Sequence, residues 1–206
     1  MWIKICGMTT PEAIEAAMAA GADAIGFVLS PSVRRLTVSE AARLAAPARG
    51  RVPCVAVTQH PSQPLLDDIL AQLRPDVWQS DVRDVETLDV PVSLAVLPVL
   101  RAAGRESDVR LPDPLPARVL YEGPRSGTGV ACDWTGARVV ARRTELILAG
   151  GLGEANVAAA IASVAPFGVD VSSGVESAPG IKSPEKILRF VEAARHAARA
   201  AEEEVG

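Results

Sequence analysis

The stretch WIKICGMTTPEAIEAAMAAGADAIGFVL (residues 2–29) contains one complete strand–helix–strand unit, and the architecture of the chain follows from it. Both ends of the stretch are short apolar runs, which are typical of buried strands. Between them, Thr10 is placed to cap a helix, Pro11 fits the first helical position and Gly21 marks the end. A helix that joins two buried strands indicates a parallel sheet covered by helices.

The same unit recurs along the chain. We expect strands in the apolar runs at residues 2–6, 23–29, 51–57, 75–79, 92–97, 117–122, 145–150 and 168–173. Helical patterns lie between most of them, at residues 9–21, 37–46, 62–73, 133–143, 154–164 and 183–204. Alternating units without a break in composition predict an α/β fold, a single (β/α)8 TIM barrel in which residues 1–206 form one domain.

The segment RAAGRESDVRLPDPLP (101–116) departs from this pattern, because one glycine and three prolines leave room for at most a short helix. The sequence therefore predicts a barrel with a degenerate fifth helix. The alternative is an open doubly wound sheet. Such sheets tend to carry a GxGxxG turn after their first strand, and this sequence has none there.

Composition limits the class of protein. Of the 206 residues, 49% are hydrophobic, which is enough for a sizeable core. Because no apolar run approaches the roughly 20 residues that cross a bilayer and no secretory signal is visible, we expect a cytoplasmic protein with no membrane partner. The formal net charge of −4 argues against general nucleic-acid binding. Cys6, Cys54 and Cys132 form no CxxC pair, so we expect no disulfide framework and assign Cys54 and Cys132 to packing or to a loop.

Barrel active sites lie at the carboxyl ends of the strands, and Cys6 ends the first apolar run. Since side chains alternate along a strand, Ile3 and Ile5 face the helices while Lys4 and Cys6 face the barrel interior. A buried cysteine can also serve only as a small apolar side chain. The eighth strand of a closed barrel pairs with the first, and alternation turns Asp170 inward. We therefore predict an interior Lys4–Asp170 ion pair.

Further polar groups lie at the predicted mouth. The loops AGGLG (149–153) and DVSSGVE (170–176) follow the last two strands, where backbone N–H groups and a helix start can bind a phosphate. Asp133 directly precedes a helical pattern, so it is a helix cap, a general acid or both. Arg34 and Arg35 follow the second strand, where an inward guanidinium would bind a carboxylate.

Five segments in chain order resemble the phosphoribosylanthranilate isomerase family of tryptophan biosynthesis: KICG (4–7), GADAIGFVLSPSVRR (21–35), SGTGVACDW (126–134), LAGGL (148–152) and GVDVSSGVESAPGIKSPEKILRFV (168–191). The last segment, with PGIK after SSGVE, is the most specific for the family.

The resemblance implies an isomerase on a (β/α)8 barrel that needs no cofactor and no metal. Its reaction is the Amadori rearrangement of N-(5'-phosphoribosyl)anthranilate to 1-(2-carboxyphenylamino)-1-deoxyribulose 5-phosphate. By motif position, Cys6 resembles the general base, Asp133 the general acid and Arg35 the arginine that meets the anthranilate carboxylate. Asp170 matches an aspartate at the family's site. The implied phosphate cradle consists of Gly150, Gly151, Ser172, Ser173 and Gly174. The expected partner is the small phosphoribosyl substrate, bound by a monomer or homodimer.

Two strand ends depart from the family pattern. The fourth strand usually ends in Gln-Leu-His-Gly, but here QSDV (79–82) places Asp81 where the histidine would stand. The sixth usually ends with an aspartate, and here Tyr121 or Glu122 is in that neighbourhood. His60 and His196 look unrelated to the chemistry.

Two other functions remain open. The chain can be another phosphosugar isomerase, including a dual-specificity barrel, although Cys6 at the end of the first strand argues against it. It can also be a non-catalytic paralogue that binds a phosphoribosyl ligand, which the presence of Cys6, Asp133 and Arg35 disfavours.

Overall fold

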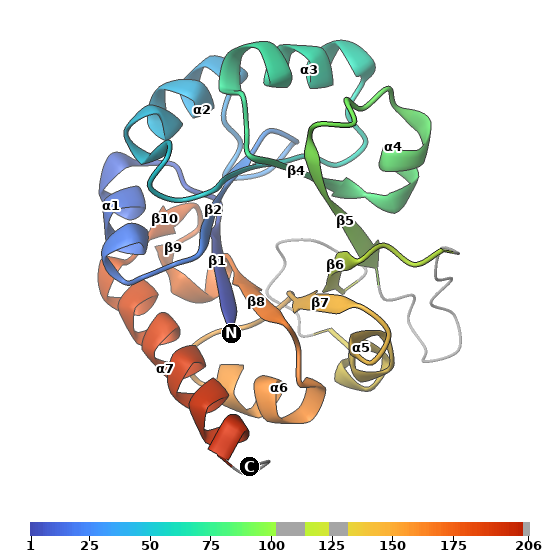
Figure 1. The fold of residues 1–206 in the computed structure, drawn as a ribbon. Coiled ribbons are helices and arrows are strands. Elements are labelled where there is room, and N and C mark those ends of the chain that lie inside the picture. Colours follow the sequence, from blue (N-terminus) through green and yellow to red (C-terminus); the bar gives the residue numbers. More distant parts are fainter. Residues whose placement is uncertain (102–113, 124–131, 204–206) are drawn as a thin grey trace.

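The structure, a computed structural model, describes residues 1–101, 114–123 and 132–203. Figure 1 shows a ring of strands enclosed by helices. The ring contains β1 (Trp2–Cys6), β2 (Ala24–Val28), β3 (Cys54–Val57), β4 (Val77–Asp81), β5 (Ala95–Arg101), β6 (Arg118–Glu122), β7 (Glu145–Leu148) and β8 (Gly168–Val171). Neighbouring strands pair in parallel, and β8 closes the barrel on β1. The predicted α/β barrel is confirmed, and the open sheet is excluded.

The helices lie on the outer side of the ring (Figure 1). They are α1 (Pro11–Ala19), α2 (Val38–Ala45), α3 (Gln63–Asp68), α4 (Val82–Thr87), α5 (Trp134–Ala141), α6 (Val157–Val164) and α7 (Pro184–Glu203). A π-helical turn, Ile69–Leu73, continues α3 to the end that the sequence predicted. A short hairpin of β9 (Glu176–Ala178) and β10 (Ile181–Lys182) follows β8.

The first helix begins and ends as its residues predict. The Thr10 hydroxyl accepts a hydrogen bond from the backbone N–H of Ala13, and Pro11 is the first helical residue. Gly21 follows the last turn with φ of +82°, in the left-handed region that glycine enters without steric conflict. The helix thus returns the chain to β2 within a few residues.

The fifth strand differs from its prediction. The sequence placed it at residues 92–97, between two prolines, but the strand is β5, Ala95–Arg101. Pro98 lies inside it, opposite Ser80 of β4. A proline lacks one N–H donor, yet pairing continues beyond it, to Val99 with β4 and to Arg101 with β6. The strand therefore ends at Arg101, and this residue lies at the mouth of the barrel.

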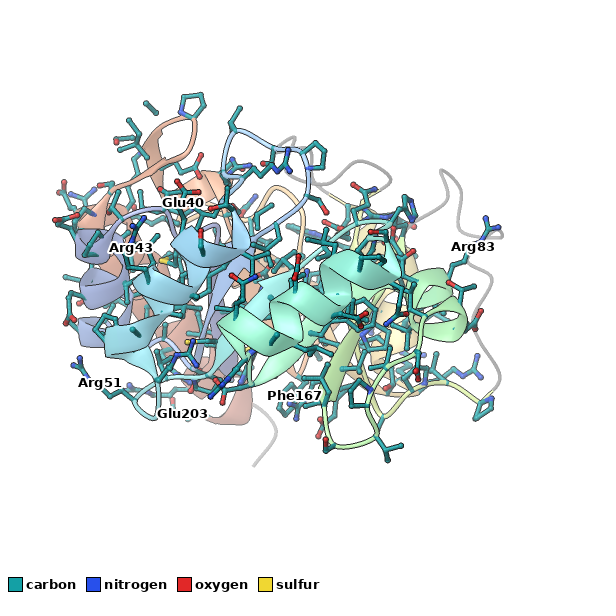
Figure 2. All side chains as sticks on the ribbon, turned by 90° about the horizontal axis from the view of Figure 1, so that it is seen from above. Glu40, Arg43, Arg51, Arg83, Phe167 and Glu203 are labelled. Carbon is teal, nitrogen blue, oxygen red and sulfur yellow. The ribbon has the colours of Figure 1, made fainter. Side chains whose placement is uncertain are left out.

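Apolar side chains form two layers. The larger layer packs strands against helices and includes Ile3, Ile5, Trp78 and Tyr121, all 0% exposed. The smaller layer, on the opposite faces of the strands, consists of Leu97, Val99, Leu120, Ile147 and Ala149. Charged side chains such as those of Arg51 and Arg83 point outward from the barrel (Figure 2). Because side chains alternate along each strand, one face of the strand packs against the helices and the other faces the barrel interior and its mouth.

Two sequence predictions concern the helices: a degenerate fifth helix and the absence of a membrane-spanning one. The degenerate fifth helix was expected at residues 101–116, and most of that segment lies outside them. Within the described ranges, none of the helices has both the length and the apolar character that crossing a membrane requires.

Candidate active site

A cavity of about 320 Å³ opens at the carboxyl ends of the strands. Its wall includes inward-facing residues from several strands, among them Cys6 of β1, Gln79 of β4, Arg101 of β5, Glu122 of β6 and Asp170 of β8. In a barrel the carboxyl ends of all strands meet at one face, so residues far apart in the chain converge there. These strand residues therefore bring a thiol, two carboxyl groups and a guanidinium to the cavity.

Cys6 lies on the cavity wall with 6% of its surface exposed. Gly7 turns the chain directly after it, with φ of +80°. Gly26 on the neighbouring strand leaves the space that the thiol occupies, because a Cβ at that position would lie 2.9 Å from the sulfur. The structure therefore confirms that Cys6 points inward, and Gly26 leaves room for its thiol.

An ion pair lies directly below the thiol. The Lys4 Nζ is 2.6 Å from the Asp170 Oδ1, and both side chains are buried, which confirms the predicted interior pair. Burial alone would lower the pKa of Lys4, but the charges of Asp170 and Cys6 raise it. Burial raises the pKa of the Cys6 thiol, and the Lys4 ammonium opposes that rise. Lys4 is therefore the main group here that favours a thiolate.

Of the two adjacent arginines after β2, Arg34 lines the cavity, whereas Arg35 is exposed. The Arg34 Nε and Nη2 donate to the two carboxylate oxygens of Glu176 at 2.6 and 2.9 Å. The Lys182 Nζ donates to the same carboxylate at 2.7 Å. Burial alone would raise the pKa of Glu176, but the two cations hold it at about 2. The implied contact between Arg35 and the substrate carboxylate stays a prediction.

Two candidate acids lie in different surroundings. Asp133 is exposed and caps α5, with one oxygen accepting from the Thr135 N–H at 3.0 Å and the other from the Gly136 N–H at 3.1 Å. Glu122 is 9% exposed and lines the cavity. Tyr121, the other residue that the sequence left open at this strand end, packs outward, and burial raises its pKa to about 12. The carboxyl group that the structure places beside the other inward groups is that of Glu122.

The loop after β7 contains two successive glycines with positive φ. Gly150 and Gly151 adopt φ of 90° and 65°. The Asn156 side chain holds the loop, because its oxygen accepts from the Gly153 N–H at 2.8 Å and its nitrogen donates to the Gly151 carbonyl at 2.9 Å. Successive glycines in the left-handed region turn backbone N–H groups away from regular pairing.

The loop after β8 packs against that loop at Gly174, where a Cβ would lie 2.0 Å from the Leu152 carbonyl oxygen. Ser172 lines the cavity, donates to the Cys6 carbonyl at 3.0 Å and lies 3.2 Å from the Lys182 Nζ. Ser173 is half-buried beside it. The five residues of the implied phosphate cradle therefore lie in two adjoining loops, with Ser172 on the cavity wall.

Comparison with known proteins shows which family has this sequence and fold. The family model for N-(5'-phosphoribosyl)anthranilate isomerase matches residues 3–193. The chain belongs to this isomerase family. The N-(5'-phosphoribosyl)anthranilate isomerase of Rhodopseudomonas palustris (strain BisA53) is 39% identical over 207 residues, covering 94% of this chain and 95% of the relative.

Solved isomerases also share the fold. The phosphoribosyl anthranilate isomerase from Thermus thermophilus aligns with a TM-score of 0.79 at 28% identity, over 95% of this chain and 99% of that one. A phosphoribosyl anthranilate isomerase in complex with reduced 1-(o-carboxyphenylamino)-1-deoxyribulose 5-phosphate aligns with a TM-score of 0.75 at 27% identity, with the same coverage.

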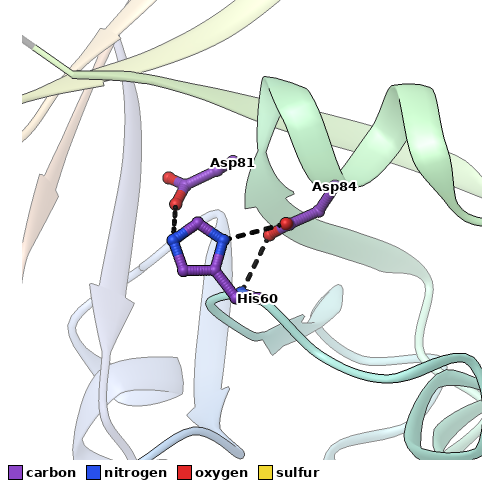
Figure 3. Close-up of side chains that lie close together, drawn as sticks. All are labelled: His60, Asp81 and Asp84. Atoms are coloured by element: carbon purple, nitrogen blue, oxygen red, sulfur yellow. Dashed lines mark hydrogen bonds and ion pairs between the residues drawn. The ribbon is translucent and has the colours of Figure 1, made fainter.

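At the end of β4, where this chain departs from the isomerase motif, His60 lies between two aspartates (Figure 3). Its Nε2 is 3.5 Å from the Asp81 Oδ2, and its Nδ1 is 3.0 Å from the Asp84 Oδ1. The His60 N–H and the Ser80 hydroxyl donate to the other Asp84 oxygen at 2.9 and 2.6 Å. The sequence predicts that His60 is unrelated to the chemistry, and the structure links it to the cavity through Asp81 and then Arg101.

The nitrogen and oxygen atoms of this cluster lie within 4.8 Å of one another, a spacing that a cation can use. However, the guanidinium of Arg101 lies 2.7 Å from the Asp81 Oδ1, so a cation there would face a charge of its own sign. Both Asp84 oxygens already accept hydrogen bonds. We therefore interpret the cluster as a hydrogen-bonded support and not as a metal site.

Sequence reasoning missed four groups that shape this isomerase site. Glu176 and Lys182 were inside the recognised final segment but received no role, and Asn156 follows the recognised glycines. Arg101 was missed because the fifth strand was placed too early. Extending the period-two alternation past Pro98 puts Leu97, Val99 and Arg101 on one face, and this signal would have found it.

Proposed function

We propose that the protein catalyses the Amadori rearrangement of N-(5'-phosphoribosyl)anthranilate to 1-(2-carboxyphenylamino)-1-deoxyribulose 5-phosphate, with Cys6 as the general base. The observation that carries the proposal is one cavity whose wall holds a thiol above a lysine and a carboxyl group from another strand. General acid–base chemistry needs such a pair of groups within reach of one substrate.

The first step opens the furanose ring. A carboxylic acid donates a proton to the ring oxygen, the bond between that oxygen and C1' breaks, and the nitrogen lone pair forms an iminium at C1'. Asp133, which the resemblance indicates for this role, has both oxygens engaged at the helix start. We assign the step to Glu122, which lines the cavity, and Asp133 is the alternative that the experiment below tests.

The second step removes the C2' proton, which the iminium acidifies. The Cys6 thiolate takes this proton, and the electron pair neutralises the nitrogen to give an enolamine. Burial raises the pKa of Cys6, so the thiol is mostly protonated in the free protein, and Lys4 and Lys182 counter this effect. The cationic substrate intermediate adds a further positive charge that favours the thiolate when it is needed.

The enolamine then gains a proton at C1' while its C2' hydroxyl loses one, which yields the ketose. Atoms and electrons balance, since the protons delivered and removed are equal in number and no net oxidation occurs. The reaction as written therefore calls for no redox partner.

The substrate carries a phosphate and a carboxylate. We assign the phosphate to the adjoining loops of Gly150, Gly151, Ser172, Ser173 and Gly174, since glycine loops before a helix suit an anion. Arg35 is exposed near the mouth and can fold over a bound substrate, whereas Arg34 is bound to Glu176. We keep Arg35 as the candidate for the carboxylate, and Asp170 as a residue that either supports Lys4 or reaches the substrate.

The experiment follows the fall in anthranilate fluorescence when freshly prepared substrate meets wild type, Glu122→Gln or Asp133→Asn. We expect loss of activity by about 10²-fold or more for Glu122→Gln. We expect Asp133→Asn to keep its kcat within a few-fold and to lose up to about 1 kcal/mol of stability through the weakened cap. The reverse ranking would return the acid role to Asp133. No turnover by folded wild type would favour the non-catalytic binding protein.

A further inference from the structure

Arg101 joins two carboxylates that come from the strands on either side of it. Its Nη2 lies 2.7 Å from the Asp81 Oδ1 on β4, and its Nη1 donates to the Glu122 Oε1 on β6 at 2.8 Å. The pairing register explains this, because Arg101 stands opposite Glu122 and Asp81 stands opposite Val99, two residues earlier on β5. The three side chains form one row along the mouth.

This row is supported from outside the cavity. Asp81 is 7% exposed and its second oxygen faces His60, which Asp84 holds through two hydrogen bonds (Figure 3). Asp84 is itself fixed by the Ser80 hydroxyl. Arg101 is therefore part of a chain of polar contacts that begins in the loop after β3 and ends at Glu122.

The row contains charges of both signs, because Arg101 is paired with two carboxylates. Asp81 neutralises the guanidinium, so Arg101 can hold Glu122 in place without leaving a full uncompensated positive charge beside it. With all three groups ionised, the two carboxylates and the guanidinium carry a net charge of −1, and each contact between opposite charges offsets part of the cost of burying them.

We propose that Arg101 is a positioning residue that directs the carboxyl group of Glu122 into the cavity, with Asp81 as its anchor. The inference rests on the proposed function, in which Glu122 donates the proton. A free glutamate side chain has several rotamers, and a charge-assisted hydrogen bond to Oε1 selects those that reach the ring oxygen. Asp81, which stands where the recognised motif has a histidine, thereby takes an indirect part in the reaction.

The test is a double-variant cycle in the full-length protein, with kcat and KM measured by anthranilate fluorescence. The variants are Arg101→Met, Glu122→Gln and the combination of both. Arg101→Lys tests rescue by a single charge. Arg118→Met is the matched control, because Arg118 lies at the amino end of β6 and forms an exposed ion pair with Glu145. Thermal unfolding of each variant verifies that it is folded.

If Arg101 acts through Glu122, Arg101→Met lowers kcat by about 10-fold to 100-fold with KM within a few-fold, and Arg101→Lys recovers part of the loss. In the Glu122→Gln background the same substitution then has less than about a twofold further effect, because the two residues act as a unit. Arg118→Met leaves both constants near wild type.

Three results would overturn the proposal. A KM that rises about 10-fold or more at unchanged kcat would mean that Arg101 binds the substrate directly. Equal losses of kcat from Arg101→Met in both backgrounds would mean that it acts independently of Glu122. Wild-type kinetics for folded Arg101→Met would remove its role altogether. The proposed function fails separately, through the absence of turnover by folded wild type, whereas full activity of Glu122→Gln would remove only the acid role of Glu122.

Discussion

At the residue scale, the charged groups near Cys6 affect the pKa of its thiol. Burial raises the pKa of Cys6, and Lys4 and Lys182 are the cations that oppose this effect. Cys54 and Cys132 are also buried, and burial raises the pKa of each to about 11. Their environments agree with the packing role that the sequence assigned to them. The thiol that is suited to chemistry is the one that lies beside an ammonium.

Lys4→Met is expected to destabilise the protein, because it leaves Asp170 buried without its cation. We expect the free energy of unfolding to fall by roughly 3–5 kcal/mol in urea denaturation. The combination Lys4→Met/Asp170→Asn should recover part of that loss, whereas Arg118→Met, at an exposed pair, should change stability by less than about 1 kcal/mol. A folded Lys4→Met protein of wild-type stability with a raised KM would instead assign Asp170 to the substrate.

At the element scale, the loop after β2 and the β9–β10 hairpin are tied together by one carboxylate. Glu176 lies between Arg34 of the loop and Lys182 of the hairpin. It also accepts a hydrogen bond from the Gly180 N–H at 3.1 Å. These three partners of one buried carboxylate tie the hairpin to the loop after β2, which lines the cavity.

This tie predicts a pH dependence of stability. The pKa of Glu176 is about 2 in the folded protein against an ordinary value of 4.5, so its contribution is complete above about pH 4.5 and is lost as the pH falls toward 2. By linkage the contribution is about 3 kcal/mol. Urea denaturation at several pH values should show this decline in wild type.

Glu176→Gln should be less stable than wild type near pH 7 and should lose less stability between pH 4.5 and 2. Glu145→Gln, at an exposed ion pair, serves as the control with a small effect at every pH. Equal acid sensitivity of Glu176→Gln and wild type would mean that other groups produce the decline.

The elements also show which features the sequence can and cannot predict. Thr10, Pro11 and Gly21 act locally, and so the first helix was predicted within two residues. The end of β5 depends on pairing with β4 and β6, which local signals around Pro98 do not report. The sequence indicated the loop after β7 because Gly150 and Gly151 allow a backbone shape that depends on few distant contacts, and its phosphate role stays a prediction.

At the scale of the whole molecule, period-two alternation and barrel closure together predicted the Lys4–Asp170 pair across 166 residues of chain. The same logic did not distinguish Glu122 from Tyr121, or Arg34 from Arg35, because each pair contains two adjacent polar residues at a strand or loop end. The choice between them depends on the packing of partners such as Arg101 and Glu176. Domain organisation, monomer or homodimer assembly and a cytoplasmic location stay predictions.

We propose that residues 1–206 unfold as one cooperative unit. Trp2, Trp78 and Trp134 lie in β1, β4 and α5, so their fluorescence reports on separate parts of the barrel. Urea unfolding followed by tryptophan fluorescence and by far-UV circular dichroism should give coincident transitions. Two separated transitions would contradict a single domain.

The central claim is that the cavity beside Cys6 performs the isomerisation. Its most direct test is the rate of anthranilate fluorescence loss with wild type and with Cys6→Ser, at equal concentrations of folded protein. Because a serine hydroxyl is a far weaker base than a thiolate, we predict rapid loss with wild type and a rate lower by about 10²-fold or more with Cys6→Ser. Equal rates for the two proteins would contradict the assignment of the base, and a wild-type rate no faster than the spontaneous reaction would contradict the isomerase activity itself.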